Sequence, residues 1–215
     1  MRSRHKPVQR HLNCTTLWTD IVLDKRGGET CPSALLPPEL EGLPYIHNIR
    51  KYAAEQASAG TWAEFGVANG NSARKFLSWM PDNTEIHLYD SFKGLPEKWI
   101  FNDDINHIGR FAVDEIPVFN DIRVHIHEGM FADTLPKMDI GVLSFVHIDC
   151  DIYSATKTVF DNIEVSRGTI ILFDEYHGYR AYKDHERKAY FEWVDKGNEF
   201  EWLAVSRSQA MGIVK

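Results

Sequence analysis

Short apolar runs alternate along the chain with segments in which apolar residues recur every three or four positions. The first pattern predicts buried β-strands, and the second predicts amphipathic helices. We expect strands near 62–67, 85–90, 122–127, 143–149, 169–174, 200–206 and 210–214. We expect helices near 45–58, 72–79, 154–163 and 182–195. This alternation predicts an α/β fold in which a largely parallel sheet is covered by helices on both faces.

The ends of the chain modify this prediction. Only a short turn, 206–209, separates the last two expected strands, which leaves room for a hairpin but for no crossover helix. One of the two strands should therefore run antiparallel. Proline and glycine are frequent over 27–44, so we interpret residues 1–44 as a partly irregular extension that could cover the active site. Residues 45–215 are then expected to form a single domain.

Composition limits the classes of function. The 215 residues are 43% hydrophobic, enough for one substantial core, and the net charge of −7 argues against broad binding of nucleic acid. The three cysteines, Cys14, Cys31 and Cys150, share no metal-ligand spacing and suggest no disulfide framework. The basic first ten residues are followed by no apolar segment, so we expect a cytoplasmic protein without membrane attachment. The negative net charge fits a small-molecule substrate better than nucleic acid.

A glycine-containing turn follows the first expected strand. The strand ends at Glu64, the chain turns through Gly66 and Gly70, and a helix follows. Glycines at such a turn let backbone N–H groups approach a ligand closely. The next strand ends in Asp90, about twenty residues after the glycines, where a carboxylate can accept hydrogen bonds from ribose hydroxyls. Together these features predict an adenosine-containing ligand, although Asp90 could simply cap a turn.

Further acidic residues follow two later strands. Asp149 ends one apolar strand, and Asp174 and Glu175 end the next. Because parallel strands end at the same edge of a sheet, we expect these carboxylates to lie together and to need a cation. A hard divalent ion such as Mg²⁺ prefers oxygen ligands, so the three residues are candidate metal ligands. The alternative is that they are helix caps at the sheet edge.

Five segments, taken together, resemble a known family. They are Glu64-Phe65-Gly66-Val67-x-x-Gly70-x-Ser72, Tyr89-Asp90-Ser91-Phe92-x-Gly94-Leu95-Pro96-Glu97, Gly129-x-Phe131-x-Asp133-Thr134-Leu135-Pro136, Asp149-x-Asp151-x-Tyr153-x-x-Thr156 and Gly168-x-x-Ile171-x-Phe173-Asp174-Glu175-Tyr176. Over about residues 60–195 they resemble the macrocin O-methyltransferase family of class I S-adenosylmethionine-dependent methyltransferases. The resemblance implies a three-layer, Rossmann-like fold whose seven-stranded sheet contains one antiparallel strand.

The resemblance also implies roles for individual residues. S-adenosylmethionine would be bound by a set drawn from the first three segments and the fourth strand: Glu64, Gly66, Val67, Gly70, Ser72, Asp90, Ser91, Phe92, Gly129 and Asp149. Mg²⁺ would be held by Asp149, Asp174 and Glu175. Members of the family generally carry Asp-Asp where this chain has Asp174-Glu175, so the third ligand departs from the pattern. We interpret His147 as a packed histidine rather than a ligand.

Methyl transfer from a sulfonium requires an acceptor oxygen held in line and a base that collects its proton. Asp149 and His177 are the two candidate bases. The apolar segment 92–101 could form a lid or could simply pack against the sheet. The acceptor is expected to be a hydroxylated small molecule, either a sugar or an aromatic diol of secondary metabolism. Because the chain is short for the family, we expect the pocket either to be open or to be completed by a second subunit of a homodimer.

Two other functions remain open from the residues alone. Asp149-x-Asp151 is also the kind of motif that binds a metal and a sugar diphosphate in glycosyltransferases, although those enzymes do not need the glycine turn. A non-catalytic, adenosine-binding protein could use the same fold.

Overall fold

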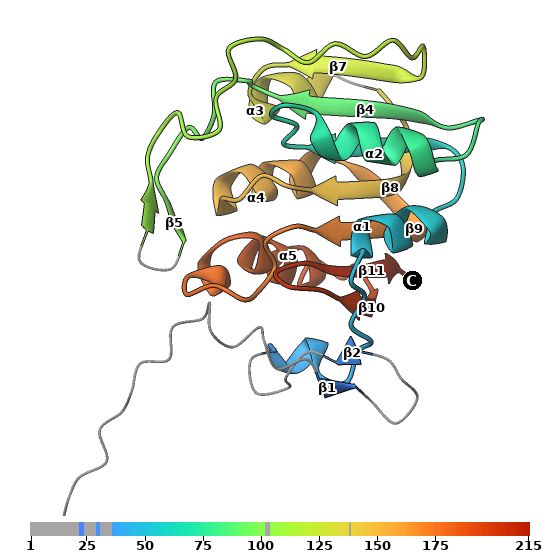
Figure 1. The fold of residues 1–215 in the computed structure, drawn as a ribbon, viewed down its shortest axis with the longest axis vertical. Helices are drawn as coiled ribbons and strands as arrows, with labels where there is room; N and C mark the ends of the chain where they lie inside the picture. The colour runs from blue at the N-terminus through green and yellow to red at the C-terminus, as the bar shows by residue number, and fades with distance from the viewer. Residues whose placement is uncertain (1–21, 24–28, 31–35, 102–103, 138) are drawn as a thin grey trace, which may run out of the picture.

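The computed structural model describes residues 22–23, 29–30, 36–101, 104–137 and 139–215. Its central feature is a seven-stranded sheet in the order β10-β11-β9-β8-β3-β4-β7 (Figure 1). The strand β11 pairs antiparallel with both of its neighbours, and the other pairings in this sheet are parallel. The expected mostly parallel sheet with one antiparallel strand is confirmed.

The strands and helices alternate as the apolar pattern predicts. The strands of the sheet are β3 (Thr61–Phe65), β4 (Glu85–Asp90), β7 (Val124–Glu128), β8 (Val142–Ile148), β9 (Glu164–Phe173), β10 (Phe200–Val205) and β11 (Ala210–Val214). The helices are α1 (Ile49–Gln56), α2 (Asn71–Trp79), α3 (Phe131–Thr134), α4 (Tyr153–Asn162) and α5 (Glu186–Val194). Short 3-10 turns, η3 (Pro38–Leu40), η4 (Leu135–Lys137) and η5 (Tyr182–Asp184), join some of them, and β1 (Val22–Leu23) pairs with β2 (Glu29–Thr30) outside the sheet.

Two apolar clusters lie on opposite faces of the sheet and make the fold three-layered. One cluster contains Phe173, Tyr190 and Trp193 and packs α4 and α5 against one face. The other contains Trp62 and Phe76 and packs α1 and α2 against the opposite face. Strands buried on both faces are apolar nearly throughout, which explains why the apolar runs identify them so well.

Some predicted boundaries differ from the structure. The helix expected over 45–58 begins only at Ile49, because 44–46 instead run along the edge strand β10, where the Ile46 N–H donates to the Val205 carbonyl (2.8 Å). The helix expected over 182–195 is a 3-10 turn followed by α5. The strand expected over 169–174 starts earlier, at Glu164.

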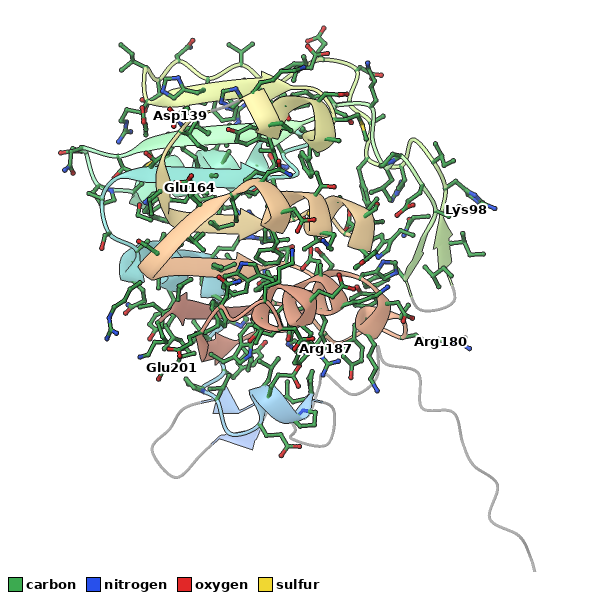
Figure 2. The ribbon with its side chains drawn as sticks, turned by 180° about the vertical axis from the view of Figure 1, so that it is seen from behind. Lys98, Asp139, Glu164, Arg180, Arg187 and Glu201 are labelled. Atoms are coloured by element: carbon green, nitrogen blue, oxygen red, sulfur yellow. The ribbon has the colours of Figure 1, made fainter. Side chains whose placement is uncertain are left out.

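The described end of the expected N-terminal extension is fastened to α5. Glu39 in η3 accepts hydrogen bonds from Arg187 Nε (2.6 Å) and Nη2 (3.0 Å) and from the Tyr176 hydroxyl (3.1 Å). In Figure 2, Arg187 lies between α5 and the η3 segment. Most of the expected extension 1–44, including Cys14 and Cys31, lies outside the described residues. In the part of the chain that the structure describes, no helix has the length and apolar character needed to cross a bilayer.

A hairpin stands beside the carboxyl ends of the strands. It consists of β5 (Trp99–Phe101), at the end of the segment where we expected a lid, and β6 (Asp104–Asn106), which follows that segment (Figure 1). The ring of Phe101 stacks on Tyr179 with centroids 4.8 Å apart, and Trp99 meets the same tyrosine edge-on at 5.9 Å. The hairpin is therefore packed against the loop that follows β9.

The loops that leave adjacent strands are joined by backbone hydrogen bonds. The Gly66 N–H donates to the Tyr89 carbonyl (2.9 Å), the Asp149 N–H to the Phe65 carbonyl (2.9 Å), and the Asp174 N–H to the Ile148 carbonyl (2.9 Å). Gly66 has a φ of +92°, and a Cβ at this position would lie 1.8 Å from the Asp149 carbonyl oxygen. Only glycine lets the ends of β3 and β8 approach this closely.

We predict that Gly66→Ala destabilises the protein more than Gly168→Ala. Gly168 has a similar φ of +99° but open space around it, so alanine there should cost only the positive φ, about 1–2 kcal/mol. The overlap at Gly66 should add at least about 2 kcal/mol. The measurement is the free energy of unfolding in denaturant for both variants. Equal losses would show that the close approach of the two strand ends is not tight.

Candidate functional site

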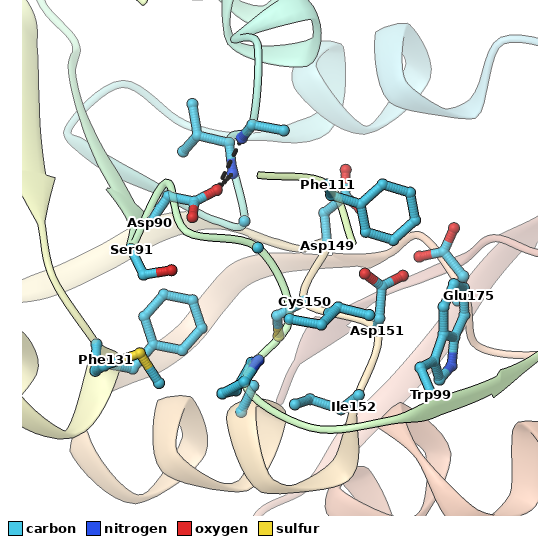
Figure 3. Close-up of a pocket in the computed structure, with 18 of the residues that line it drawn as sticks. Asp90, Ser91, Trp99, Phe111, Phe131, Asp149, Cys150, Asp151, Ile152 and Glu175 are labelled. Atoms are coloured by element: carbon cyan, nitrogen blue, oxygen red, sulfur yellow. Dashed lines mark hydrogen bonds between the residues drawn. The ribbon is translucent and has the colours of Figure 1, made fainter. Parts of the chain in front are cut away.

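A cavity of about 260 Å³ opens at the carboxyl ends of β3, β4, β8 and β9 (Figure 3). Its wall combines loop backbone, carboxylates and aromatic rings. The lining residues are Gly66, Val67, Ala68, Asp90, Ser91, Gly94, Leu95, Pro96, Trp99, Phe111, Gly129, Met130, Phe131, Asp149, Cys150, Asp151, Ile152, Ala155 and Glu175. Ligands of open α/β sheets bind at this edge, so the cavity is the candidate functional site.

Unusual backbone conformations gather at this cavity. Among the described residues, the non-glycine residues with positive φ are Ala68, Phe92, Phe111 and Asp151. All of them line the cavity except Phe92, which directly follows the lining residue Ser91. Left-handed conformations cost such residues free energy and are kept where the surroundings or the function require them. Their placement supports this cavity as the functional site.

Asp90 organises the loop after β3. Its Oδ2 accepts hydrogen bonds from the backbone N–H groups of Val67 (2.8 Å) and Ala68 (2.8 Å) (Figure 3). Its Oδ1 accepts one from the backbone N–H of Phe92 (2.7 Å). One carboxylate thereby fixes two loops: the loop after β3, residues 66–70, here called the glycine loop, and the loop that follows β4. Asp90 lines the cavity, and its present contacts are those of the turn-capping alternative. Its predicted role toward a ribose stays a prediction.

Several carboxylates meet around the ends of β8 and β9. Asp149, Asp174 and Glu175 each offer an oxygen, and these oxygens lie within 4.8 Å of one another. Asp149, Asp151 and Glu175 reach the cavity, as Figure 3 shows. The fully buried Glu186 of α5 accepts the Glu175 backbone N–H through Oε2 (3.2 Å). The sequence prediction that separate strand ends bring acids together therefore holds for these residues.

Two cationic groups from the described part of the chain contact this acidic cluster. Arg50 of α1 donates from Nη2 to Asp174 Oδ1 (2.5 Å). The fully buried His147 lies between two acids, with Nε2 3.4 Å from Asp174 Oδ1 and Nδ1 3.4 Å from Glu64 Oε1. Gln209 also donates to Asp174 Oδ1. These contacts converge on a single oxygen of Asp174, which leaves Oδ2 for another partner.

The charge balance separates Asp174 from the other acids. Burial alone would raise the pKa of Asp174, but the hydrogen bond to His147 and the charge of Arg50 hold it at about 2. Burial and the negative charge of Asp174 raise the pKa values of Asp149 and Glu175 well above their usual range. Burial and the same neighbour raise the pKa of Asp151 to about 7. The cluster therefore contains more carboxyl groups than the two cationic groups, Arg50 and His147, can neutralise.

The sequence comparison decides the family. The family model of macrocin O-methyltransferase (TylF) matches residues 43–191, which is more than half of the chain. The chain belongs to this family. The resemblance drawn from the five segments is thus confirmed, and the protein is an S-adenosylmethionine-dependent O-methyltransferase. No curated protein sequence shows a significant match to the chain.

Solved structures support the fold of this O-methyltransferase. The O-methyltransferase NovP superimposes with a TM-score of 0.58 at 23% sequence identity, covering 77% of this chain and 77% of NovP. An O-methyltransferase from Bacillus cereus in complex with SAH gives a TM-score of 0.50 at 14% identity, covering 84% of each chain. At these identities the similarity concerns the Rossmann-like fold alone.

The structure of this O-methyltransferase brings only part of the predicted cofactor set to the cavity. Gly66, Val67, Asp90, Ser91, Gly129 and Asp149 line it. Glu64 is fully buried and accepts a hydrogen bond from Ser72. A Cβ on Gly70 would meet the ring of Phe119 at 2.7 Å, so this glycine packs beneath that ring, and Phe92 belongs to an apolar cluster. These four residues shape the loops behind the cavity wall.

His177 does not reach the cavity. Its side chain is 1% exposed, and Nε2 lies 3.3 Å from the Gln209 carbonyl oxygen beneath the β10–β11 hairpin. Burial lowers its pKa to about 4. The loop position after β9 made His177 a candidate base, but the loop turns its side chain into the protein. The structure therefore gives His177 a packing role and leaves Asp149 as the candidate base.

Some residues of the site gave no signal in the sequence. Arg50 lies on α1, 124 positions from Asp174, and Glu186 lies on α5, 11 positions after Glu175. No local pattern marks a helical charge as facing the sheet. Gln209 reaches Asp174 from the final hairpin. His147 is packed, as expected, but its contacts with Asp174 and Glu64 raise its pKa to about 10, against the effect of burial. It therefore acts as a buried cation.

We predict that Asp90→Asn weakens binding of S-adenosylhomocysteine at least about 10-fold. The side-chain amide would place its own N–H₂ donor against backbone N–H groups that now donate hydrogen bonds to the Asp90 carboxylate. The loop after β3 would then lose its fixed shape. Glu128→Gln, at the paired position on β7, is the matched control and should bind normally. Isothermal titration calorimetry measures both. Unchanged affinity in Asp90→Asn would remove Asp90 from the cofactor site.

We predict that His147 makes the metal-free protein less stable at alkaline pH. The folded state keeps a proton to a pKa of about 10, whereas the ordinary value is 6.5, so this stabilisation is complete below pH 6.5 and is lost towards pH 10. His147→Gln should flatten the decline by up to about 1.4 kcal/mol per pH unit. The test is the free energy of unfolding against pH, with exposed His47→Gln as control. Parallel curves for wild type and His147→Gln would contradict it.

Proposed function

We propose that the protein is a Mg²⁺-dependent O-methyltransferase whose acceptor is a small molecule with neighbouring hydroxyl groups. The observation that carries this proposal is the cluster of Asp149, Asp174 and Glu175, of which Asp149 and Glu175 line the cavity that also contains the glycine loop and Asp90. A cofactor site and an acidic cation site then open into one space. This is the arrangement that methyl transfer to a metal-bound hydroxyl requires.

The glycine loop suits the methyl donor. The backbone of 66–68 faces the cavity, and the position of Gly66 admits no side chain. We assign the donor's amino-acid part to this loop and its ribose to Asp90. S-adenosylmethionine supplies the methyl group as a sulfonium when bound. Its positive charge would be favoured beside a wall that carries Asp90, Asp149 and Asp151.

The donor set at the strand ends fits Mg²⁺. All three candidate ligands offer oxygen, and Glu175 Oε2 is buried without a hydrogen-bond partner among the described residues. The contacts of Asp174 with Arg50, His147 and Gln209 all involve Oδ1, so Oδ2 is left for a metal ion. When bound, Mg²⁺ would lower the pKa of an acceptor hydroxyl and fix its orientation. Glu175 would take the place of the second aspartate that the family usually carries, and its side chain is one methylene longer.

The proton of the acceptor needs a base at the same place. Asp149 lies on the cavity floor and is the residue we assign to this step. Asp151 stands beside it with a pKa of about 7, so it can take up a proton near neutral pH. Asp149 and Asp151 therefore supply carboxylates that can take the proton of a methyl-acceptor molecule bound in the cavity.

The outer wall suggests the class of acceptor. Trp99, Phe111 and Phe131 line the cavity together with Leu95 and Pro96. Flat apolar rings above an acidic floor favour a ring that has one apolar face and hydroxyls at its edge. An aromatic diol and a sugar both meet this description. We assign the acceptor to the space between the β5–β6 hairpin and the strand ends.

The glycosyltransferase alternative uses Asp149 and Asp151 alone. It gives no role to the loop that Asp90 fixes, and the family to which the chain belongs transfers methyl groups. A non-catalytic, adenosine-binding protein would not need a cluster of unneutralised acids in its cavity. Both alternatives make distinct predictions in a binding experiment, because only the proposed function requires S-adenosylhomocysteine and Mg²⁺ to bind together.

We predict that Asp149→Asn and Glu175→Gln each lower kcat/KM at least about 100-fold, because they remove a metal ligand and, for Asp149, the base. The assay follows formation of S-adenosylhomocysteine by mass spectrometry, with a panel of catechols and sugar-bearing compounds, after chelation and with Mg²⁺ restored. Asp195→Asn, an exposed acid at the end of α5, is the control and should keep wild-type activity.

Activity that survives chelation and both substitutions would contradict Mg²⁺ dependence while leaving methyl transfer intact. Binding of a uridine diphosphate sugar, with no binding of S-adenosylhomocysteine, would instead support the glycosyltransferase alternative. Binding of S-adenosylhomocysteine that is unaffected by Mg²⁺, with no turnover of any acceptor, would favour the non-catalytic alternative.

A further inference from the structure

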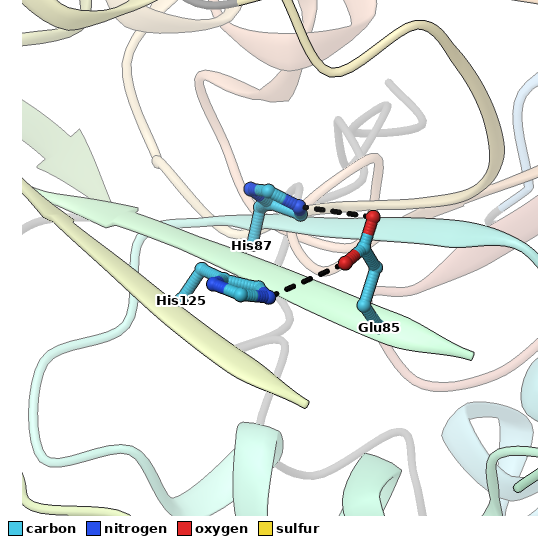
Figure 4. Close-up of side chains that lie close together, drawn as sticks. All are labelled: Glu85, His87 and His125. Atoms are coloured by element: carbon cyan, nitrogen blue, oxygen red, sulfur yellow. Dashed lines mark ion pairs between the residues drawn. The ribbon is translucent and has the colours of Figure 1, made fainter. Parts of the chain in front are cut away.

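A second group of potential metal ligands lies at the opposite end of the sheet. Glu85 begins β4, whereas the cavity residue Asp90 ends it, so the two sites are separated by roughly 16 Å of strand. His87 lies two residues after Glu85 on the same face, and His125 of β7 is its direct cross-strand partner. Figure 4 shows both rings turned toward the carboxylate of Glu85.

We propose that Glu85, His87 and His125 form a binding site for a first-row transition metal ion of the Zn²⁺ type. His125 Nε2 lies 3.3 Å from Glu85 Oε2, and His87 Nε2 lies 3.7 Å from Glu85 Oε1. The three candidate ligand atoms lie within 4.8 Å of one another. Two ligands of a tetrahedral Zn²⁺ ion are about 3.3 Å apart, so small side-chain movements would complete the site.

The state of His87 points to a ligand that the protein itself does not provide. The residue is 8% exposed, and its Nε2 is buried without a hydrogen-bond partner among the described residues. The 3.7 Å separation from Glu85 Oε1 is too long for a hydrogen bond. A buried polar nitrogen normally has a partner, and an ion between His87, His125 and Glu85 would supply one.

His127 holds the ring of His87 in the orientation that metal binding needs. His87 Nδ1 and His127 Nε2 are 2.9 Å apart, so one proton is shared between them. With that proton on His87 Nδ1, the lone pair of its Nε2 faces Glu85. Metal-bound histidines usually donate their other N–H to a neighbouring group in this way. His127 is also stacked on Tyr89, with ring centroids 4.5 Å apart, which fixes its own position.

The proposed ion differs from Mg²⁺ in chemistry and in role. Two imidazoles and one carboxylate favour Zn²⁺, Ni²⁺ or Cu²⁺, whereas Mg²⁺ prefers oxygen ligands only. Within the described residues, β7 forms one end of the sheet order and pairs with β4 alone. An ion shared by Glu85, His87 and His125 would join these two strands beyond their backbone hydrogen bonds and stabilise the sheet edge.

The test uses Co²⁺ as a spectroscopic substitute for Zn²⁺, titrated into metal-free, full-length protein with excess Mg²⁺ present to occupy the oxygen site. We expect the visible absorption of tetrahedral Co²⁺ in wild type and at least about a 10-fold loss of affinity in His125→Ala, whose side chain is 42% exposed and tolerates truncation. His127→Phe, which keeps the stacking, should lose about 10–100-fold. Exposed His47→Ala is the control.

A second readout is thermal unfolding. Zn²⁺ at about 100 times its dissociation constant should raise the midpoint of wild type and of His47→Ala by roughly 5–10 °C, and that of His125→Ala by much less. The proposal is overturned if no tetrahedral Co²⁺ absorption develops, or if wild type and His125→Ala bind Co²⁺ with the same affinity. It is also overturned if Zn²⁺ stabilises both proteins equally.

Discussion

The buried carboxylates at the ends of β8 and β9 repel one another. This repulsion determines which of them need a cationic partner and which have raised pKa values. Arg50 and His147 hold the pKa of Asp174 low, so this acid stays ionised within the protein, and His147 also contacts Glu64. The remaining acids face the cavity with raised pKa values, because burial and the charge of Asp174 disfavour their ionised forms. The Mg²⁺ ion that we propose would offset this repulsion and use the same carboxylates as ligands.

The backbone brings the glycine loop after β3 to the same place. Gly66 packs against the Asp149 carbonyl oxygen, and Asp90 accepts three backbone N–H groups from the adjacent loops. A change at any of these positions would therefore alter the loop geometry and the acidic floor together. Ala68 and Asp151, both left-handed, lie in the loops that leave these strand ends.

The sequence predicted the fold and the location of the site because both depend on local patterns. Apolar runs mark strands, and residues that follow parallel strands must share one edge, so Asp90, Asp149 and Glu175 could be placed together before any contact was known. Direction within a loop is a different matter. His177 follows the same strand as Glu175, yet its ring turns under the final hairpin.

Long-range electrostatic partners were also beyond prediction. Arg50 contacts Asp174 across 124 positions of sequence, and nothing near Arg50 indicates that its helix face meets the sheet edge. His87 and His125 pair only because β4 and β7 are neighbours in that register. The alternating residues His125 and His127 were the one local sign that this strand presents histidines on one face.

The most direct measurement is a crystal structure of the protein grown with S-adenosylhomocysteine and Mn²⁺, with the metal located by its anomalous scattering. The account predicts a peak bonded to Asp149, Asp174 and Glu175, with the nucleoside beside Asp90 in the same cavity. S-adenosylhomocysteine bound in this cavity with no metal peak at the three acids, or a peak held elsewhere while these acids remain unbound, would contradict it.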